Sequence, residues 1–372
     1  MQDFLNSTNF TQIFIALILI KFLLETYLKI RNLKSIDNNK DSVPPRFKDV
    51  VTEEEYKKSI LYNTDRIKFQ IFTALFGSVV LVIFTIGGLL NYLTQVVMDM
   101  TSSNVLGAVL LGLLLIIVEE IISIPISIYS TFVIEERHGF NKTTRKTFIT
   151  DIFKGLLISG AISSILYATV IFIIISAGDL WWIYAFAAVF TLQAIIFFLY
   201  PVLIMPLFNK FEPLDDEQFK KPIEKLLEKV DFKSKGLFVM NASLRSTHGN
   251  AFFTGFGKNK RIVFFDTLLK TINPDEMEAI LGHELGHYKL GHIRKTLISS
   301  LVFGFIGFYI LNEIFKSDNF FIAHGLENLT VYSKFLMFYL VIGSYTFFTK
   351  PITSALSRKR EFEADDFSFQ FT

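Results

Sequence analysis

Residues 279–289 of the chain read AILGHELGHYK and contain the pattern H-E-x-x-H at His283, Glu284 and His287. On an α-helix, side chains four positions apart share a face, so the two histidines can bind one metal ion from adjacent turns. A catalytic zinc ion takes three protein ligands and leaves the fourth position to water, from which a neighbouring carboxylate can accept a proton. The pattern therefore predicts two zinc ligands and, in Glu284, a catalytic carboxylate.

The residues around this pattern predict a capped and packed helix. Asn273 stands at the N-cap position, Pro274 at the first helical position and Glu276 where a capping box needs its glutamate. Apolar residues at helical spacing give the helix a face to bury: Met277, Ile280, Leu281 and Leu285. A third ligand must come from elsewhere in the chain.

The composition bounds the class of protein. Of the 372 residues, 51% are hydrophobic and 42 are Phe, and their long apolar runs indicate a membrane protein. Cysteine is absent, which excludes disulfides, thiolate metal ligands and a cysteine nucleophile. A net charge of +2 argues against a nucleic-acid partner.

Seven apolar stretches are long enough to cross a bilayer, at about twenty residues per span. The first contains Lys21 and Glu25 near its end and has no Lys or Arg before it, so it is interpreted as a retained anchor and not as a cleavable signal. The seven stretches are Phe10–Ile30, Phe69–Leu93, Val105–Val133, Ile152–Ala177, Leu180–Phe208, Thr296–Phe315 and Leu329–Phe348.

Lys and Arg gather in alternate loops. The loop Arg31–Lys68 holds nine of them, whereas Thr94–Asn104 holds none. By the positive-inside rule the N-terminus lies outside and the segment 209–295, with the H-E-x-x-H pattern, lies in the cytosol. We expect a mainly α, seven-span membrane bundle with a small cytosolic α+β metallopeptidase domain. Its expected parts are 1–208 with five spans, 209–295 with the pattern, and 296–372 with the last two spans and a third-ligand segment.

The cytosolic segment mixes helix and strand patterns. Asp216–Val230 has apolar residues at helical spacing, and three short runs are typical of strands, the last two joined by the hairpin-like Gly255–Lys260. A short sheet with a free edge beside a zinc helix could hold an extended peptide through backbone hydrogen bonds. The alternative is that the strands are only scaffold. The three runs are Gly236–Met240, Asn250–Thr254 and Arg261–Asp266.

Two carboxylates, Glu119 and Glu120, interrupt the third apolar stretch. A charge at mid-bilayer is unfavourable by roughly 3 kcal/mol on insertion scales, so the pair indicates either a hydrated cavity or a structural pairing with a basic or amide side chain. It also leaves open a transport or scaffold function, with the metal site structural or inactive. Against this, a structural zinc site is closed by four protein ligands, and only three are found.

The third ligand is sought after the last apolar stretch, where residues 357–365 read SRKREFEAD. On a helix, Glu361 and Asp365 share a face, while Glu363 points away and is expected to be solvated. Glu361 is the candidate ligand. Asp365 can accept a hydrogen bond from the outer nitrogen of a ligating histidine and so fix its tautomer.

Together these stretches resemble the CAAX prenyl protease type 1 (Ste24-like) group of peptidase family M48. The resemblance runs in family order from the loop near Val43-Pro44 to Asp365. It includes LGHELGHYKLGH and SRKREFEAD, together with FVIEERHGFN at 132–141, STHGNA at 246–251 and KNKRIVFFDTLL at 258–269.

The resemblance implies seven helices that enclose a large chamber, closed on its cytosolic side by the zinc domain. It implies one zinc ion per chain, bound by His283, His287 and Glu361, and a substrate strand beside Asn250-Ala251. The type member removes the last three residues of a C-terminal C-a-a-X sequence after its cysteine is prenylated.

Family members continue past the Ala-Asp pair with a helical region that supplies a basic or imidazole group near the oxyanion. This chain ends at Thr372, so we expect a C-terminus that is truncated relative to that pattern. His248 and His292 are candidates for oxyanion stabilisation or for packing.

We therefore expect a zinc metalloendopeptidase in the membrane that hydrolyses peptide bonds with an activated water. Its partners would be a peptide or protein substrate, with or without a prenyl group, and the lipid bilayer. Its location would be the bacterial inner membrane or the endoplasmic reticulum membrane. The alternative within this chemistry is an HtpX-like quality-control protease, although that branch has fewer spans.

Overall fold

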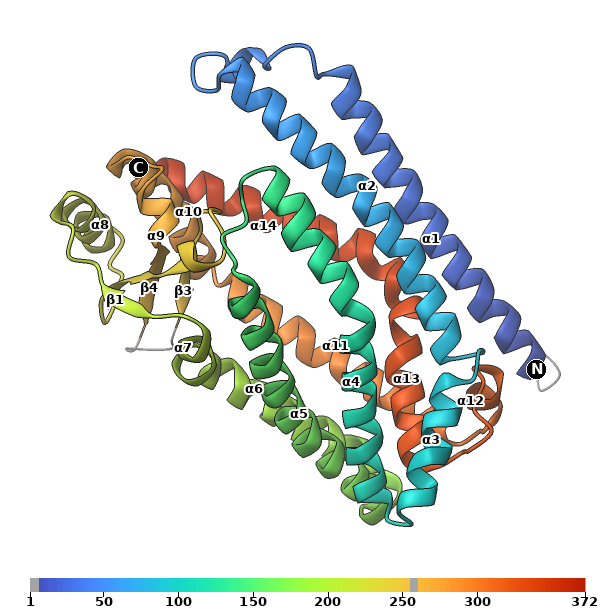
Figure 1. Ribbon diagram of the computed structural model, residues 1–372. Coiled ribbons are helices and arrows are strands. Elements are labelled where there is room, and N and C mark those ends of the chain that lie inside the picture. Colours follow the sequence, from blue (N-terminus) through green and yellow to red (C-terminus); the bar gives the residue numbers. More distant parts are fainter. Residues whose placement is uncertain (1–6, 255–259, 372) are drawn as a thin grey trace. The chain divides into compact units, whose positions relative to one another are not determined.

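The computed structural model describes residues 7–254 and 260–371, which are mainly helical, as expected (Figure 1). The chain divides into two units, each assembled from three segments. Unit 1 takes residues up to 139 with 155–185 and 309–348, and unit 2 takes 140–154, 186–308 and 349 onward. The three-part division expected along the sequence stays a prediction.

Long helices make up unit 1. They are α1 (Ser7–Asn38), α2 (Glu53–Phe84), α3 (Leu89–Met100), α4 (Asn104–Tyr129) and α13 (Val331–Thr346), with the short α12 (Asn319–Ala323). Three further helices have residues in both units: α5 (Arg145–Ser176), α6 (Trp181–Leu199) and α11 (His292–Phe315). After Pro125, the end of α4 widens into a π-helical turn at Ser130–Glu135.

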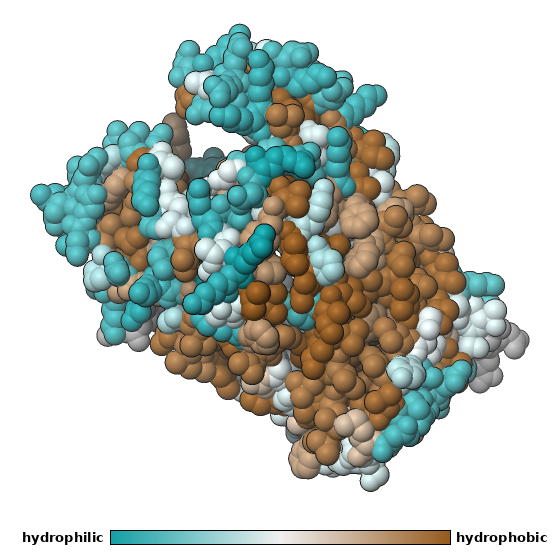
Figure 2. Space-filling model, in the orientation of Figure 1, coloured by the Kyte–Doolittle hydropathy of each residue, from teal (hydrophilic) through white to brown (hydrophobic). Residues whose placement is uncertain are grey.

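Six helices of the described residues are long and apolar enough to cross a membrane, and the protein is a multi-pass integral membrane protein. In Figure 2, brown hydrophobic side chains cover the middle of the α1–α2 pair and teal hydrophilic ones its upper end. The predicted first span lies in α1, which is not among the six, so a seventh crossing stays a prediction. The six are Glu53–Phe84, Asn104–Glu135, Arg145–Ser176, Gly178–Phe208, His292–Phe315 and Val331–Phe371.

The predicted span Phe69–Leu93 is wrong as a single helix, because the chain turns between α2 and α3. Gly88 has a φ of 78°, a left-handed conformation that glycine adopts without a Cβ clash. The turn is also tightly packed, since a Cβ on Gly325 would lie 2.4 Å from the carbonyl oxygen of Thr85. α3 then extends through most of the predicted loop Thr94–Asn104.

Unit 2 contains a four-stranded sheet in the order β1-β2-β4-β3. β2 (Leu237–Met240) runs parallel to β4 (Arg261–Phe265), and β1 (Phe211–Pro213) and β3 (Ala251–Thr254) pair antiparallel at the two edges. The three predicted strands are confirmed to within one residue at each end. β1 was missed because three residues give no readable alternation. Most of the predicted β3–β4 hairpin, residues 255–259, lies outside the described residues.

Two helices share a core with this sheet. They are α8 (Glu217–Lys229), which Asp216 caps, and α10 (Pro274–Lys289). Each large side chain buried between them contributes about 2 kcal/mol, and together they fix α10 against the sheet beside β3. The buried set includes Phe219, Ile223, Leu226, Ala251, Ile262, Phe264, Met277, Leu281 and Leu285.

His324, between α12 and α13, is fully buried in unit 1. Its Nδ1–H donates to the carbonyl oxygen of Phe320 at 2.6 Å, and its Nε2 accepts from the hydroxyl of Tyr345 at 3.0 Å. The carbonyl can only accept, so this pairing fixes the neutral tautomer. Burial lowers the pKa of His324 to about 4.

We expect the thermal stability of the protein to fall as the pH falls from about 7 to about 4. An unfolded histidine binds a proton below about pH 6.5, whereas folded His324 does not until about pH 4, so acid favours the unfolded chain. Melting temperatures measured across this range should have a shallower pH slope in His324→Gln. The same pH dependence of the melting temperature in the original protein and in His324→Gln would contradict the lowered pKa of His324.

Candidate metal centre

α10 presents the H-E-x-x-H pattern on a helix that is fixed at its start. The Asn273 side chain accepts from the Glu276 N–H at 2.9 Å, and the Glu276 carboxylate accepts from the Asn273 N–H at 2.9 Å. This capping box, with Pro274 at the first turn, is the one that the sequence predicted. The buried face of α10 points into the core, which leaves His283 and His287 half-buried on the other side.

α14 (Lys350–Phe371) runs antiparallel to α10 and brings the third predicted ligand to it. The two backbones approach closely at Gly286, where a Cβ would lie 2.9 Å from the Cα of Ala364 and 3.2 Å from the Cβ of Phe367. The hydroxyl of Ser368 also donates to the carbonyl oxygen of Ala279 at 2.9 Å. Gly286 is therefore the glycine that this helix pair requires.

His283, His287 and Glu361 converge on one point. The two Nε2 atoms lie 3.1 Å apart, and each lies 3.4 Å from Oε2 of Glu361. Two ligand atoms about 2.1 Å from a tetrahedral centre are separated by about 3.4 Å, so these three atoms fit one zinc-sized cation. Among the described residues they form the one cluster of this kind that could hold a metal ion.

The outer nitrogen of His283 is held by Asp365. Nδ1 lies 2.7 Å from Oδ1 of Asp365. The carboxylate can only accept when ionised, so Nδ1 carries the proton and Nε2 presents its lone pair to the site. Asp365 therefore lies where its carboxylate can orient the His283 ring, and its part in a metal site stays a prediction.

The outer nitrogen of His287 is held by a different pair of residues. Its Nδ1 lies 2.9 Å from Nδ1 of His292, and Nε2 of His292 lies 3.0 Å from a carboxylate oxygen of Glu363. With Glu363 as acceptor, His292 is protonated at Nε2 and accepts from Nδ1–H of His287. His292 is 3% exposed. Glu363, predicted to be solvated, has a side chain that is 35% exposed, and it also accepts the hydrogen bond that ends this relay.

Glu284 lies half-buried one position round the same helix. Loss of solvent raises the pKa of its carboxyl, and the neighbouring His287 and His283 oppose that rise. A carboxyl with a raised pKa can accept a proton from water and release it again near neutral pH.

The edge strand β3 has an asymmetric free edge. The carbonyl of Asn250 accepts from the N–H of Phe265 on β4, so by alternation Ala251 and Phe253 direct their backbone groups outward. The Asn250 side chain takes the outward N–H of Ala251 at 2.8 Å. By the same alternation, the N–H of Phe253 and the carbonyls of Ala251 and Phe253 face away from β4.

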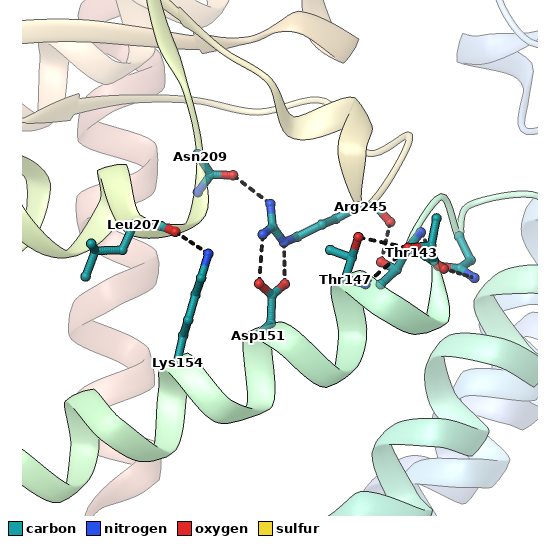
Figure 3. Close-up of polar contacts among 9 residues, drawn as sticks. Thr143, Thr147, Asp151, Lys154, Leu207, Asn209 and Arg245 are labelled. Atoms are coloured by element: carbon teal, nitrogen blue, oxygen red, sulfur yellow. Dashed lines mark hydrogen bonds and ion pairs between the residues drawn. The ribbon is translucent and has the colours of Figure 1, made fainter.

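Sequence reading missed the residue that holds the loop before β3. Arg245 forms a two-point ion pair with Asp151 of α5, at 2.7 and 3.0 Å, and donates to Asn209 at 3.1 Å (Figure 3). Its carbonyl accepts from the hydroxyl of Thr143 at 3.0 Å. No spacing in the sequence links these positions. His248, three residues on, is exposed and stacks on Phe140 at 4.4 Å.

The membrane helices and this centre define a membrane metallopeptidase. Residues 32–210 match the model of the CAAX prenyl protease N-terminal region, described as five membrane helices, and residues 213–372 match that of peptidase family M48. The chain belongs to peptidase family M48.

Full-length relatives support this membership. The chain is 34% identical to a CAAX prenyl protease 1 homologue of Arabidopsis thaliana, with 96% of this chain and 86% of the relative covered. It is also 34% identical to CAAX prenyl protease 1 of Saccharomyces cerevisiae, over 94% and 82%. The crystal structure of S. mikatae Ste24p superposes with a TM-score of 0.89 at 30% identity, covering 97% of this chain and 88% of that one. The resemblance inferred from the motifs is therefore confirmed.

We expect Gly286→Ala to lower the free energy of unfolding by about 2 kcal/mol, because overpacking would push α14 from α10. The same shift should displace Glu361 and reduce bound zinc. Thermal unfolding and zinc content measure the two effects. The control is Gly307→Ala in α11, where a Cβ meets nothing within 4 Å. If Gly286→Ala and Gly307→Ala had the same stability and the same zinc content, the close contact between α10 and α14 at Gly286 would not be needed for the site.

We expect Asp365→Asn to weaken zinc binding by about 10- to 100-fold, since a neutral amide orients and polarises His283 less well. The control is the same change on the next residue, Asp366→Asn. The Asp366 side chain is exposed, so this variant should leave zinc affinity unchanged. Competition with a chelator measures both constants without reference to activity. A zinc affinity that is equal in the two variants would exclude Asp365 as the orienting group.

Proposed function

We propose that this protein is a zinc-dependent endopeptidase that removes the C-terminal tripeptide of prenylated C-a-a-X proteins. The observation that carries the proposal is the triangle of donor atoms from His283, His287 and Glu361, 3.1–3.4 Å apart, with Glu284 on the same helix. The relatives whose names include CAAX prenyl protease 1 support the substrate class.

The donor set favours one zinc ion per chain. Two imidazoles and one carboxylate with a fourth position open are typical of hydrolytic zinc enzymes, and a closed structural site would need a fourth protein ligand. Bound there, zinc would polarise the substrate carbonyl and lower the pKa of water.

Glu284 carries the proton in this scheme. Its carboxylate accepts a proton from the attacking water and donates it to the departing amine, which requires a group that changes protonation state readily. Asp365 and the His292–Glu363 pair accept hydrogen bonds from the Nδ1 side of the two imidazoles and so direct Nε2 of each ring toward the metal. These residues position the ligands and do not touch the substrate.

The substrate peptide lies along β3 as an added strand. The free groups of Ala251 and Phe253 hydrogen-bond the substrate backbone whatever its side chains are, and Asn250 shapes that edge by occupying one N–H. Arg245 supports this arrangement by anchoring the preceding loop to α5.

The distribution of Lys and Arg supports a cytosolic location for the metallopeptidase part and an outside N-terminus. With α1 as the seventh crossing, the helices would enclose the chamber implied by the family resemblance. The membrane would be that of the endoplasmic reticulum or the bacterial inner membrane.

We expect Glu284→Gln to retain zinc and to lower kcat by about 100- to 10,000-fold, because only the proton acceptor is lost. The assay is cleavage of a farnesylated C-a-a-X peptide and of the same peptide without the farnesyl group, with metal content measured in parallel. Glu278→Gln, on the same helix, is the control and should remain active.

Three outcomes separate the possibilities. Cleavage that needs Glu284 and strongly prefers the farnesylated peptide supports the proposal. Equal cleavage of both peptides would favour a quality-control protease. Unchanged activity in Glu284→Gln would overturn the catalytic assignment.

A further inference from the structure

The loop that precedes β3, residues 241–250, is held at both of its ends within unit 2. At its start, the N–H of Lys210 donates to Oδ1 of Asn241 at 2.7 Å, and the N–H of Asn241 donates to the carbonyl oxygen of Lys210 at 3.3 Å. Near its end, the carbonyl oxygen of His248 accepts from the hydroxyl of Thr267 at 2.8 Å. The loop therefore enters β3 along a defined path.

A second segment supports the middle of this loop, because residues 140–143 pair antiparallel with residues 245–248. The carbonyl oxygen of Arg245 accepts from the N–H of Lys142 at 3.0 Å and from the hydroxyl of Thr143 at 3.0 Å. Residues 140–143 lead directly into α5, so this pairing brings the loop beside the first turns of that helix.

Asp151 of α5 holds the loop through the side chain of Arg245 (Figure 3). Its two carboxylate oxygens lie 2.7 Å from Nε and 3.0 Å from Nη2 of the guanidinium, and this two-point pairing fixes the orientation of the group. Nη1 donates to Asn209 at 3.1 Å. Both charged side chains are 25% exposed, so loss of one charge would leave the other in a half-buried place without its partner.

Lys154, one turn further along α5, makes a comparable contact with a different part of the chain. Its ammonium donates to the carbonyl oxygen of Leu207 at 2.7 Å, in α7 (Met205–Phe208) (Figure 3). Asp151 and Lys154 both anchor a distant segment to the same helix. Asp151 holds the loop that precedes β3, whereas Lys154 holds α7.

This anchoring has a consequence for an edge strand that receives a peptide. A strand that is already ordered loses less conformational freedom when a peptide adds to it, so the peptide binds more tightly. α10, in contrast, is held by its own capping box and by the core that it shares with the sheet. Loosening the loop should therefore weaken peptide binding and leave the zinc ligands in place.

We propose that Asp151 is a positioning residue for the substrate peptide and acts through Arg245 on the strand edge at Asn250 and Ala251. The inference rests on the proposed peptidase function, with the peptide along β3. Asp151 does not touch the substrate. It keeps the edge preformed, and its loss raises KM without a matching loss of kcat or of zinc affinity.

The test is steady-state cleavage of the farnesylated C-a-a-X peptide by the full chain in detergent, with zinc content measured in parallel. We expect KM to rise about tenfold in Asp151→Ala and in Arg245→Met, with kcat changed less than about threefold, because a loss confined to KM marks binding that is equal in the ground and transition states. The double variant should be no worse than either single variant, since all three lose the same contact. Asp151→Asn keeps an acceptor for the guanidinium, so its KM should be intermediate, and it tests the inference even if Asp151→Ala does not fold.

Lys154→Ala is the matched control. It loses an anchor on the same helix but keeps the loop before β3 attached, so it should retain the original KM even if its melting temperature falls. Hydrogen exchange of the backbone at residues 241–254, measured on the same proteins, should become faster in Asp151→Ala and should not change in Lys154→Ala.

The outcomes separate the inference from the proposed function. If the original protein cleaves the peptide and KM is unchanged in both Asp151 variants, the inference is wrong and the peptidase function stands. If KM rises in Arg245→Met but in neither Asp151 variant, Arg245 contacts the substrate itself and the inference is again wrong. If the original protein cleaves no C-a-a-X peptide, the proposed function fails and the inference fails with it.

Discussion

The metal centre depends on how closely two antiparallel helices can approach. At Gly286 the backbone of α14 lies where any larger residue would place its Cβ, and this contact sets the position of Glu361 opposite the two histidines. Helix pairs normally separate by 8–10 Å according to the side chains between them. A carboxylate has a short reach, so a glycine at the crossing determines whether the third ligand meets the other two.

Polar groups around the centre are paired in a way that specifies proton positions. Each histidine of the pattern has its outer nitrogen engaged, that of His283 by Asp365 and that of His287 by His292, which in turn contacts Glu363. Two carboxylates thus act at a distance from the metal position, one directly and one through a buried ring. These hydrogen bonds limit how far each imidazole ring can turn, because turning a ring breaks the bond to its outer nitrogen.

Much of the metallopeptidase part could be predicted from the sequence, because its elements are specified by residues close together in the chain. The capping box, the strands Leu237–Met240 and Arg261–Phe265 and the shared face of Glu361 and Asp365 all follow from short-range patterns. What failed depends on contacts between distant segments. The turn at Gly88 is packed by the loop at Gly325, which lies more than two hundred residues further along the chain. Arg245 and Asp151 have no common pattern, because only the fold brings them together.

The chain order of the ligands has a consequence for biosynthesis. His283 and His287 are synthesised before α11, α12 and α13, and Glu361 follows all three. On the proposed assignment, a nascent chain that has completed α10 contains both imidazoles and Glu284 but not yet Glu361, so the proposed zinc site is incomplete at that stage. Hydrolytic competence then arises only after the later membrane helices have been made.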